Sequence, residues 1–547
     1  MLFPTFDFLL FALPVLIGFW ALAERPVARV LFLLCASYFF YMAGPKTEPL
    51  PAPWYYAGLL AFSTLLDFVA GGAIHRLAPA ADGDDPRRAA WARRKQGAWL
   101  LASLVGNLGL LGYFKYANFL IEAFGDIAGA AGIPVSGLHL DVVLPLGISF
   151  YTFQSLSYTL DIWRGRLEPE PSLRRFALFV VFFPQLVAGP IVRAKELLPQ
   201  LRAGPRFSRE GLEVGAFRIC KGLVKKVVLG DFIAVALTDR IFDAPTTFSS
   251  AELMVALYAY TLQIYADFSG YSDIAIGLSR MLGFSIPENF DRPYQSRDIA
   301  EYWRRWHMTL STWLRDYVFF SVLSRLGSRW GYFAVWLTMF LVGMWHGASW
   351  NFVFYANIHA LAMVFNRWNR TRPPQPLSRR LLLWPLGLGA IAAAVAGIAW
   401  FGLRLPWPQA IGVGVGVAVL MLGISALPSA GGRLNAAAHV ALTFHLLVLS
   451  RIFFRSPDLA TSRDFITGLV ALDGHGIRPG LTTPWVWGLL AFGLVYHLTP
   501  RRWVDESLCR AFRRVPGVVL GLGFIALAYG LMRLMQDQPR AFIYFQF

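Results

Sequence analysis

The chain has 547 residues, of which 56% are hydrophobic and only 15% charged, and its mean hydropathy is +0.50. A soluble protein carries about a quarter charged residues, so the composition excludes a soluble globular enzyme and indicates a polytopic membrane protein. The net charge is +17, but the basic residues lie in short loops beside apolar runs, as the positive-inside rule predicts, and this argues against nucleic-acid binding.

The chain begins with an apolar segment whose first basic residue is Arg25. A cleaved signal peptide starts with a basic region, so we expect this segment to remain as the first membrane span. The three cysteines, Cys35, Cys220 and Cys509, lie far apart and form no CxxC pair. They predict neither a disulfide framework nor a zinc site, and we expect no bound cofactor or metal.

Loops rich in arginine predict which side of the membrane is cytoplasmic. Residues 75–96, 366–380 and 500–514 are such loops, whereas residues 116–163 contain no Lys or Arg. Three predicted spans before residue 75, together with the apolar runs after residue 380, place both termini outside the cytoplasm. Those runs are 381–403, 410–427, 437–453, 485–499 and 516–532.

The middle of the chain does not alternate in this way. Between Phe176 and Tyr332 the apolar segments are short, and basic residues flank them on both sides. This pattern predicts re-entrant or membrane-surface helices, and irregular backbone survives at depth only when it is buried in protein or lines a wet cavity. We therefore expect one membrane domain over 1–547, with N-terminal helices in 1–140, a catalytic core in 141–370 and C-terminal helices in 371–547.

Two acidic residues, Asp267 and Asp273, interrupt the apolar segment 263–284. They can hold the core together by pairing with arginines, or they can line a polar cavity. Pairing is favoured because buried acids rarely lack a partner.

Residues 296–320 space their apolar side chains as one face of a helix, with arginines on the other side. This spacing predicts an amphipathic helix at the membrane interface. Trp303, His307 and Ser311 are four residues apart and would share one face. A tryptophan-anchored surface helix explains the aromatic and basic residues, but it does not explain His307 on the buried stripe.

A long stretch without charged residues holds His346 and His359. Residues 331–345 and 350–365 predict two helices of roughly 22–24 Å, each shorter than the ~30 Å hydrocarbon core. Gly347 lets the chain reverse between them, so His346 lies at a helix break where it can face a cavity. An ionisable group at this depth indicates a functional site, with a buried structural histidine as the alternative. For His359, which has no glycine beside it, we favour the structural role.

A buried histidine beside a second polar group, without a cysteine nucleophile or metal cluster, suits general-base catalysis. An imidazole of ordinary pKa is mostly neutral at pH 7 and can remove the proton of a hydroxyl group. A thioester is already activated, so the hydroxyl oxygen can attack it without a covalent enzyme intermediate.

Five motifs in this order resemble a known family. They are PLGISFYTFQSLSYTLDIWRG (145–165), YADFSGYSDIAIG (265–277), FDRPYQSRDIAEYWRRWHMTLSTWLRDYVF (290–319), MWHGASWNF (344–352) and the terminal FIYFQF. As a set they resemble the membrane-bound O-acyltransferase family, and most closely its bacterial branch of alginate O-acetylation and D-alanyl transfer proteins. The segment 318–331 departs from the glycine- and asparagine-rich sequence that is frequent there in alginate O-acetylation members.

The resemblance implies that His346 is the catalytic base and that His307 occupies the second, variable catalytic position of the family. It also implies an all-α fold with roughly 11–13 membrane helices. These helices are expected to form a ring around a thinned, re-entrant core that a tunnel crosses past the histidine.

Two further groups of residues are hypotheses about contacts with the donor and the acceptor. Arg297, Arg304 and Arg305 are expected where the phosphates of a cytoplasmic donor could be steered, although contact with lipid headgroups explains them equally well. The expected substrate or tunnel positions are Trp303, Trp306, Ser311, Asn351, Asp267 and Gln154.

The expected function is membrane O-acyl transfer, from acetyl-CoA or another cytoplasmic acyl thioester to a hydroxyl group on an exported polysaccharide or a partner protein. D-alanyl or peptidoglycan acyl transfer is an alternative, as is a transporter or flippase of cell-envelope components. Transporters usually show paired repeats, which this sequence lacks. The expected location is the bacterial inner membrane, and the expected partners are a polysaccharide or cell-wall polymer, membrane lipids and a periplasmic or secreted esterase-like transferase.

Overall fold

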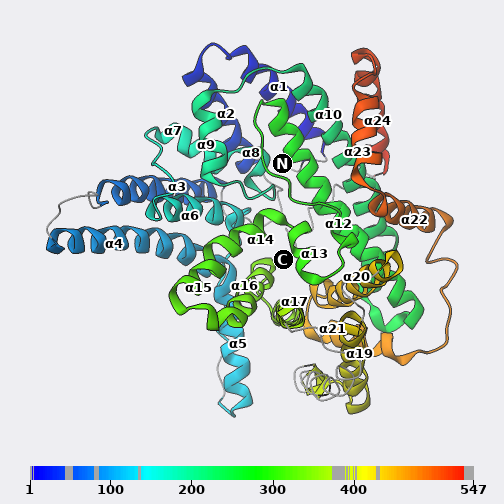
Figure 1. Cartoon of the computed structure of the whole chain (residues 1–547). Coiled ribbons are helices and arrows are strands. Elements are labelled where there is room, and N and C mark those ends of the chain that lie inside the picture. Colours follow the sequence, from blue (N-terminus) through cyan, green and yellow to red (C-terminus); the bar gives the residue numbers. More distant parts are fainter. Residues whose placement is uncertain are drawn as a thin grey trace.

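The computed structural model describes residues 5–43, 53–78, 86–133, 137–371, 403–426 and 432–534, with Phe3 and scattered positions between 389 and 400. Within these ranges the chain is helical and contains no strand, so the predicted all-α fold is confirmed (Figure 1). Most of the predicted run 381–403 and the C-terminal motif FIYFQF lie outside the described residues.

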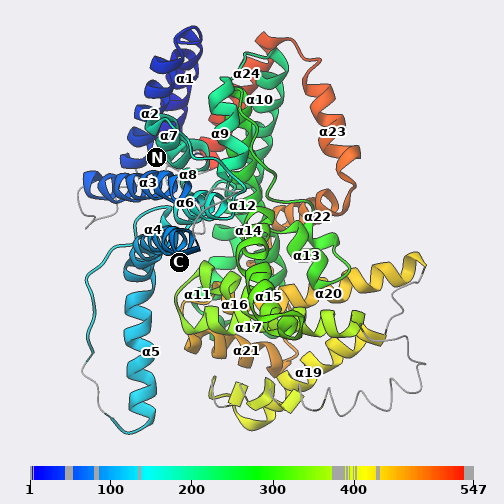
Figure 2. The same cartoon turned by 60° about the vertical axis from the view of Figure 1, so that its left-hand side comes forward.

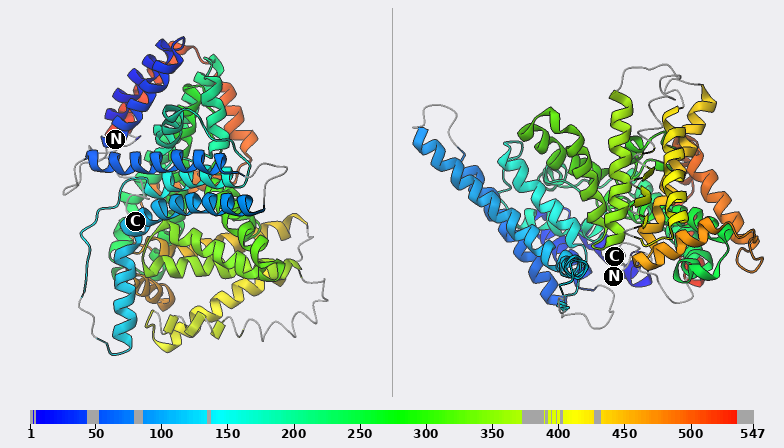
Figure 3. Two further views of the ribbon diagram at one scale, coloured as in Figure 1. Left: turned by 90° about the vertical axis from the view of Figure 1, so that its left-hand side faces the viewer. Right: turned by 90° about the horizontal axis from the view of Figure 1, so that it is seen from below.

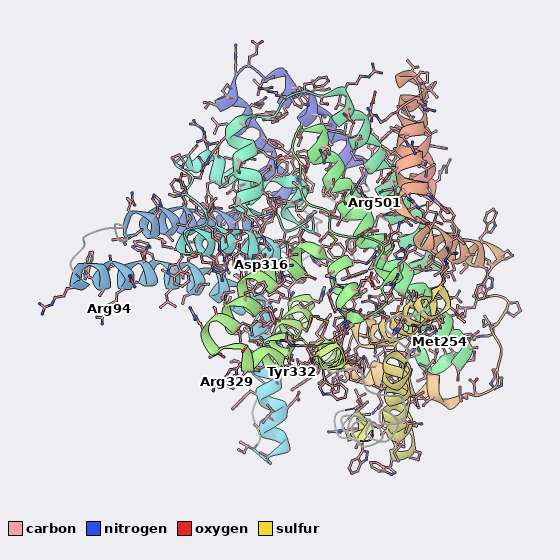
Figure 4. All side chains as sticks on the ribbon, in the orientation of Figure 1. Arg94, Met254, Asp316, Arg329, Tyr332 and Arg501 are labelled. Carbon is pink, nitrogen blue, oxygen red and sulfur yellow. The ribbon has the colours of Figure 1, made fainter. Side chains whose placement is uncertain are left out.

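The N-terminal helices form one side of the molecule. Helices α3 and α4 pack against each other and against α6, and the three project together from the body (Figures 1 and 3). Figure 4 shows Arg94 at the outer end of α4. The bounds are α1 (Phe6–Ala21), α2 (Pro26–Met42), α3 (Pro53–Arg76), α4 (Pro86–Leu111), π-helical η1 (Gly112–Tyr116) and α5 (Ala117–Ala130).

The central helices surround α12, which runs through the middle of the molecule (Figures 1 and 2). Several are short, and π-helical turns interrupt others. The bounds up to α12 are α6 (Ile148–Trp163), α7 (Leu173–Val181), α8 (Phe183–Leu186), α9 (Ala194–Ala203), α10 (Arg209–Leu223), η2 (Val224–Asp231), η3 (Ala234–Thr238), α11 (Asp239–Asp243), η4 (Pro245–Thr247) and α12 (Ser250–Met281). Those that follow are η5 (Pro293–Gln295), α13 (Ile299–Arg305), α14 (Met308–Leu314), η6 (Arg315–Phe319), α15 (Phe320–Leu326), η7 (Ser328–Trp330), α16 (Gly331–His346) and α17 (Trp350–Thr371).

The C-terminal helices flank α12 on the opposite side from α3 and α4 (Figure 1). Helix α20 packs against α17 and α12, and α22 and α23 contact α12 and α10, respectively. The bounds are α19 (Trp407–Ala426), α20 (Arg433–Arg455), α21 (Leu459–Ala471), α22 (Pro484–Leu498), α23 (Arg501–Phe512) and α24 (Gly517–Leu534).

The irregular middle of the chain is buried in protein. Residues 176–194 are buried without exception, although α7, α8 and α9 leave non-helical backbone between them. The side chain of Thr309 accepts a hydrogen bond from the amide of Ile191 at 3.0 Å. Protein groups thus satisfy backbone donors that lipid could not, as the sequence predicted for this region.

The predicted amphipathic helix over residues 296–320 is wrong as one continuous element. Helix α13 ends at Arg305, Trp306 is extended, and α14 begins only at Met308. The segment before α13 stabilises the break, because the carbonyl of Asn289 accepts a hydrogen bond from the amide of Met308 at 3.0 Å. Trp303, His307 and Ser311 therefore do not share a helix face.

Few of the described helices are long enough to cross a bilayer. By length and hydropathy, Trp54–Arg76, Ala90–Gly129 and Arg433–Arg455 qualify, and Arg501–Phe512 with Gly517–Leu531 adds a fourth if that bent pair is one span. This is below the predicted 11–13 membrane helices. The physical reason is length: apolar helices such as α6 and α16 have 16 residues each, about 24 Å.

Candidate active site

The break after His346 occurs where the sequence predicts it. Helix α16 ends at His346 and α17 begins at Trp350. Gly347 is extended, with φ −163°, so its backbone suits any residue. A Cβ atom there would, however, lie 2.0 Å from Cε2 of Phe352. The close approach of the Phe352 ring therefore requires glycine at position 347. Without a side chain there, the chain can turn directly after the histidine.

His307 has an unusual backbone. Its φ is +44°, in the left-handed region, and it is one of only four non-glycine residues with positive φ in the described part of the chain. This conformation is unfavourable for a residue with a side chain and is found mostly where surrounding structure holds it in place. Here Asn289 holds it through the bond from Met308 described above.

The two predicted catalytic histidines lie close together. Their ring centroids are 6.4 Å apart and the ring planes are inclined by 60°. His307 is fully buried and His346 is 2% exposed. The indole of Trp345 contacts both, at 5.2 Å from each ring centroid. The fold thus brings the two motifs that carry the histidines into one aromatic-walled site.

The hydrogen bonds of Asn289 define the tautomer of His307. The Oδ1 atom of Asn289 accepts hydrogen bonds from the amide of Thr309 at 3.3 Å and from its hydroxyl at 2.9 Å. Nδ1 of His307 lies 3.2 Å from the same oxygen and must therefore donate to it. The neutral ring then carries its lone pair on Nε2, which has no hydrogen-bond partner among the described residues. The site holds a buried imidazole with a free acceptor nitrogen.

Aromatic rings enclose both imidazoles. Phe150 and Phe268 pack on His307 at 6.4 and 4.8 Å between centroids. Phe454 and Tyr355 pack edge-on against His346 at 5.2 and 6.2 Å. Few water molecules fit such surroundings, so charges that develop there are screened weakly and hydrogen bonds to them are strong.

A buried cation, which the sequence reading missed, lies behind His346. Arg451 is fully buried and donates to the hydroxyl oxygens of Tyr302 at 2.9 Å and Tyr355 at 3.4 Å. Its guanidinium lies over the rings of Trp306 and Phe454, and within the described ranges its polar partners are the two tyrosine hydroxyls rather than a carboxylate. The sequence contains a signal for this residue, because Arg451 lies within the predicted span 437–453 and an arginine within a membrane span indicates function.

Of the three predicted tunnel residues at the α13–α14 break, Trp306 contacts this cation. Trp306 is 1% exposed and packs on Arg451, whereas Trp303 is 4% exposed and packs on His359. The hydroxyl of Ser311 donates to the carbonyl of Trp306 at 3.3 Å, across the helix break. These aromatic side chains are core residues rather than anchors in a surface helix.

Two other predicted tunnel residues have structural contacts. Asn351 donates to the carbonyl of Ser456 at 2.8 Å and accepts from the hydroxyl of Ser462 at 3.0 Å, joining α17 to the α20–α21 junction. Asp267 pairs with Lys226 at 2.5 Å. Gln154 differs, because its fully buried amide has no hydrogen-bond partner among the described residues.

Asp273 is also paired. It lies 2.7 Å from Arg218, 2.8 Å from Lys225 and 3.2 Å from Lys221. The prediction that the two acids of α12 pair with cations is therefore confirmed, although the partner of Asp267 is a lysine. His359 likewise has the expected structural surroundings, with Nε2 3.1 Å from the hydroxyl of Ser450.

The arginines predicted to steer a donor lie at the surface. Arg297 and Arg304 are exposed, and Arg305 pairs with Glu301 at 2.8 Å and with Asp291 at 3.8 Å. Two of the three cations are thus available to a charged partner, while the third stabilises its own helix.

Two small cavities, each of about 30 Å³, lie near these residues. The first cavity is lined in part by Asn289, the hydrogen-bond partner of His307. The positive and negative side chains that line this cavity are nearly equal in number. The cations and acids that line it are Arg218, Lys221, Lys225, Arg292, Arg501, Asp273, Glu288, Asp291 and Asp505. Burial raises the pKa of the Glu288 carboxyl, but the hydrogen bond from Arg218 and the positive charges of Arg218 and Arg501 together leave that pKa below its ordinary value.

The second cavity lies between α13, α17 and α20, at the end of α17 that precedes the basic loop. Asp298, Ile299, Ala362, Phe365, Asn366, Asn369, Thr443 and Leu446 line it. Asp298 pairs with Arg370 at 2.5 Å and directly follows Arg297. Within the described ranges, no group of His, Cys, Asp or Glu side chains is arranged to hold a metal ion.

Comparisons with known proteins are consistent with this geometry. The model of the membrane-bound O-acyltransferase family matches residues 166–385, a range that includes both histidines. The chain is 40% identical to the probable alginate O-acetylase AlgI of Pseudomonas aeruginosa, over 67% of this chain and 66% of that protein. It is 33% identical to the peptidoglycan O-acetyltransferase of Helicobacter pylori, over 67% and 70%. It is 31% identical to the teichoic acid D-alanyltransferase of Bacillus subtilis, over 43% and 62%.

Proposed function

The chain belongs to the membrane-bound O-acyltransferase family, and from this membership we propose that it transfers an acetyl group from a cytoplasmic thioester to a hydroxyl group of an exported polysaccharide. The main observation in support of the proposal is that His346 and His307 lie close together in one buried site. Acetyl and polysaccharide are favoured because similarity to the alginate O-acetylase is higher and covers more of the chain than similarity to the D-alanyltransferase.

In the proposed reaction, His346 is the general base. Its neutral imidazole takes the proton of the acceptor hydroxyl while the hydroxyl oxygen attacks the thioester carbonyl carbon. The tetrahedral intermediate then expels the thiolate as the C–S bond breaks, and the imidazolium returns the proton to sulfur. The products are an O-acetyl ester and a free thiol, and the histidine ends in its starting state.

We assign His307 the role of orienting the acceptor. Its Nε2 lone pair can accept a hydrogen bond from a hydroxyl group in the site, because Nδ1 is committed to Asn289. A separation of 6.4 Å between the two rings lets one small group contact both. The reacting hydroxyl donates its one proton to His346, so Nε2 of His307 accepts a hydrogen bond from a second hydroxyl group of the acceptor. Holding the acceptor at both points would bring the reacting oxygen near the acyl carbon, which is where positioning contributes to rate.

We place the approach of the donor at the second cavity, beside Asp298. Two observations support this choice: the exposed Arg297 lies next to it in the chain, and the basic loop after α17 marks the cytoplasmic side by the positive-inside rule. Between this cavity and His346 lie the buried side chains of Tyr302, Tyr355 and Arg451. A donor that reaches His346 by this route must displace or pass these three side chains.

The acceptor is proposed to approach from the opposite, extracytoplasmic side, because an exported polymer meets the enzyme there. A periplasmic or secreted esterase-like transferase can receive the acetyl group in place of the polymer and complete the transfer. Membership of an acyltransferase family argues against the transporter alternative.

The proposal is tested with inverted membrane vesicles that contain the full chain. Acetyl-CoA labelled in the acetyl group is supplied outside the vesicles, on the cytoplasmic face, and a soluble oligosaccharide acceptor is enclosed within. We expect labelled ester on the enclosed acceptor at a rate above that of vesicles without the protein. Equal rates in both preparations would refute acetyl transfer, and label moving only from a D-alanyl thioester would assign the alternative acyl group.

A further inference from the structure

The C-terminal end of α16 receives its hydrogen bonds from another helix. The ammonium of Lys115 lies 2.6 Å from the carbonyl oxygen of Trp345 and 3.3 Å from that of His346. The hydroxyl of the next residue, Tyr116, donates to the carbonyl of Met344 at 2.8 Å. Two consecutive side chains thus bind the last three carbonyl groups of α16, and the last of these belongs to the proposed catalytic base.

These carbonyls need external donors for a geometric reason. The last four carbonyl groups of a helix have no partner within it. In most helices, water or the following turn supplies donors, but here Gly347 is extended and the chain turns away at once. A buried carbonyl without a partner is destabilising, and a cation at a helix C-terminus is favoured by the helix dipole. Lys115 therefore completes α16 where the backbone cannot.

The position of the two donors depends on a π-helical turn. Lys115 and Tyr116 end η1, the five-residue π-helix that joins α4 to α5. Single π-turns within α-helices are rare and frequently accompany functional sites. The ammonium also lies 5.8 Å above the ring of Trp345, and no acidic partner for it is found in the described ranges. It lies 3.5 Å from the hydroxyl of Ser149 on α6 as well, but its two shorter hydrogen bonds are directed at the end of α16.

We propose that Lys115 and Tyr116 are positioning residues for catalysis, which hold the backbone of residues 344–346 so that the His346 ring keeps its reactive orientation. The inference rests on the proposed function of His346 as base. Neither residue touches a reacting atom. A ring at the end of a helix next to a three-residue turn can swing with its backbone, and displacement of a catalytic group by about 1 Å can cost on the order of 100-fold in rate.

The test compares variants of the full chain in membranes, with acetyl transfer measured at several donor concentrations. Lys115→Met keeps the length of the side chain but removes the donors, and we expect kcat to fall about 10- to 100-fold with KM for the donor unchanged. Lys115→Arg restores donors and should recover most of kcat. Tyr116→Phe removes one hydroxyl and should lower kcat roughly fivefold.

Asn357→Ala is the matched control. It removes the acceptor for Nε1 of Trp336, a 3.1 Å bond between the middle of α16 and α17, without touching the end of the helix. Its kcat should equal that of the wild type. If Asn357→Ala and Lys115→Met lose kcat equally, or if Lys115→Arg fails to recover activity at normal thermal stability, the positioning role is overturned.

A His346→Ala variant separates this inference from the proposed function. If His346→Ala is inactive and Lys115→Met has wild-type kcat, the positioning inference alone is wrong. If His346→Ala remains fully active, the proposed function fails first, and any effect of Lys115→Met then reports only on folding.

Discussion

The Oδ1 atom of Asn289 lies 3.2 Å from Nδ1 of His307 and is held as an acceptor by the amide and hydroxyl of Thr309. This contact decides which ring nitrogen faces the site. Because Nδ1 must donate, Nε2 carries the lone pair that can bind a hydroxyl group. An asparagine outside the reacting groups thus sets the chemistry of a residue within them.

Replacing Asn289 tests the tautomer directly. Asn289→Ala removes the acceptor for Nδ1, so the imidazole can carry its proton on Nε2 instead, and we expect kcat to fall at least about tenfold. Asn289→Asp retains an acceptor oxygen and should lose much less. Acetyl-transfer kinetics on membranes with equal amounts of each variant measure the effect, and equal activities for Ala and Asp would contradict the tautomer assignment.

The left-handed backbone of His307 predicts a difference in stability that is independent of catalysis. His307→Ala and His307→Gly both remove the ring and should both be nearly inactive. Glycine adopts φ +44° without strain and alanine does not. We therefore expect His307→Gly to be more stable than His307→Ala by about 1 kcal/mol, measured by thermal unfolding in detergent. A more stable Ala variant would show that the strain is absent.

Gly347 predicts a steric effect that a second substitution can relieve. In Gly347→Ala the new Cβ would lie 2.0 Å from Cε2 of Phe352, so the ring must move or the turn must open next to His346. We expect reduced transfer and a lowered unfolding temperature. Adding Phe352→Leu should restore part of both, because neighbouring substitutions are not additive when they share a contact. Strictly additive losses in the double variant would exclude this contact as the cause.

The exposed Arg304 predicts a salt-dependent effect on donor binding. Arg304→Glu reverses an exposed charge that is proposed to steer the phosphates of the donor. KM for acetyl-CoA should rise at low ionic strength, the difference should shrink as salt screens the charges, and kcat should not change. Arg325→Glu is a control on another exposed helix. If both variants raise KM equally, Arg304 has no specific role in steering.

The sequence predicts His346 from a strong local signal, whereas the catalytic role of His307 follows only from the family resemblance. An uncharged stretch interrupted by Trp-His-Gly placed His346 at a helix break, and the structure puts the end of α16 there. Composition alone predicts a polytopic membrane protein, and the family resemblance adds the all-α fold. The sequence also predicts that the helices over 331–345 and 350–365 are short, because fifteen or sixteen apolar residues cannot span a bilayer.

The remaining features depend on contacts between distant segments, which periodicity does not encode. The spacing of Trp303, His307 and Ser311 fits a helix, but Asn289 bonds to the backbone after His307 and the helix breaks there. Lys115 directly precedes a stretch without basic residues. Its role at the end of α16 cannot be predicted from local sequence, because its partner Trp345 lies 230 residues away in the chain. Asn351 is a predicted substrate or tunnel residue near His346 in sequence, whereas its tertiary hydrogen bonds are with Ser456 and Ser462.

The central claim is that His346 acts as the base, and the most direct measurement is the initial rate of acetyl transfer by His346→Gln at equal amounts of folded protein. His475→Ala, which changes an exposed histidine in the loop between α21 and α22, is the control and should match the wild type. A general base contributes about 10²- to 10⁴-fold, so we predict a loss of that size in His346→Gln with unchanged abundance and thermal stability. Transfer at the wild-type rate by His346→Gln would contradict the account.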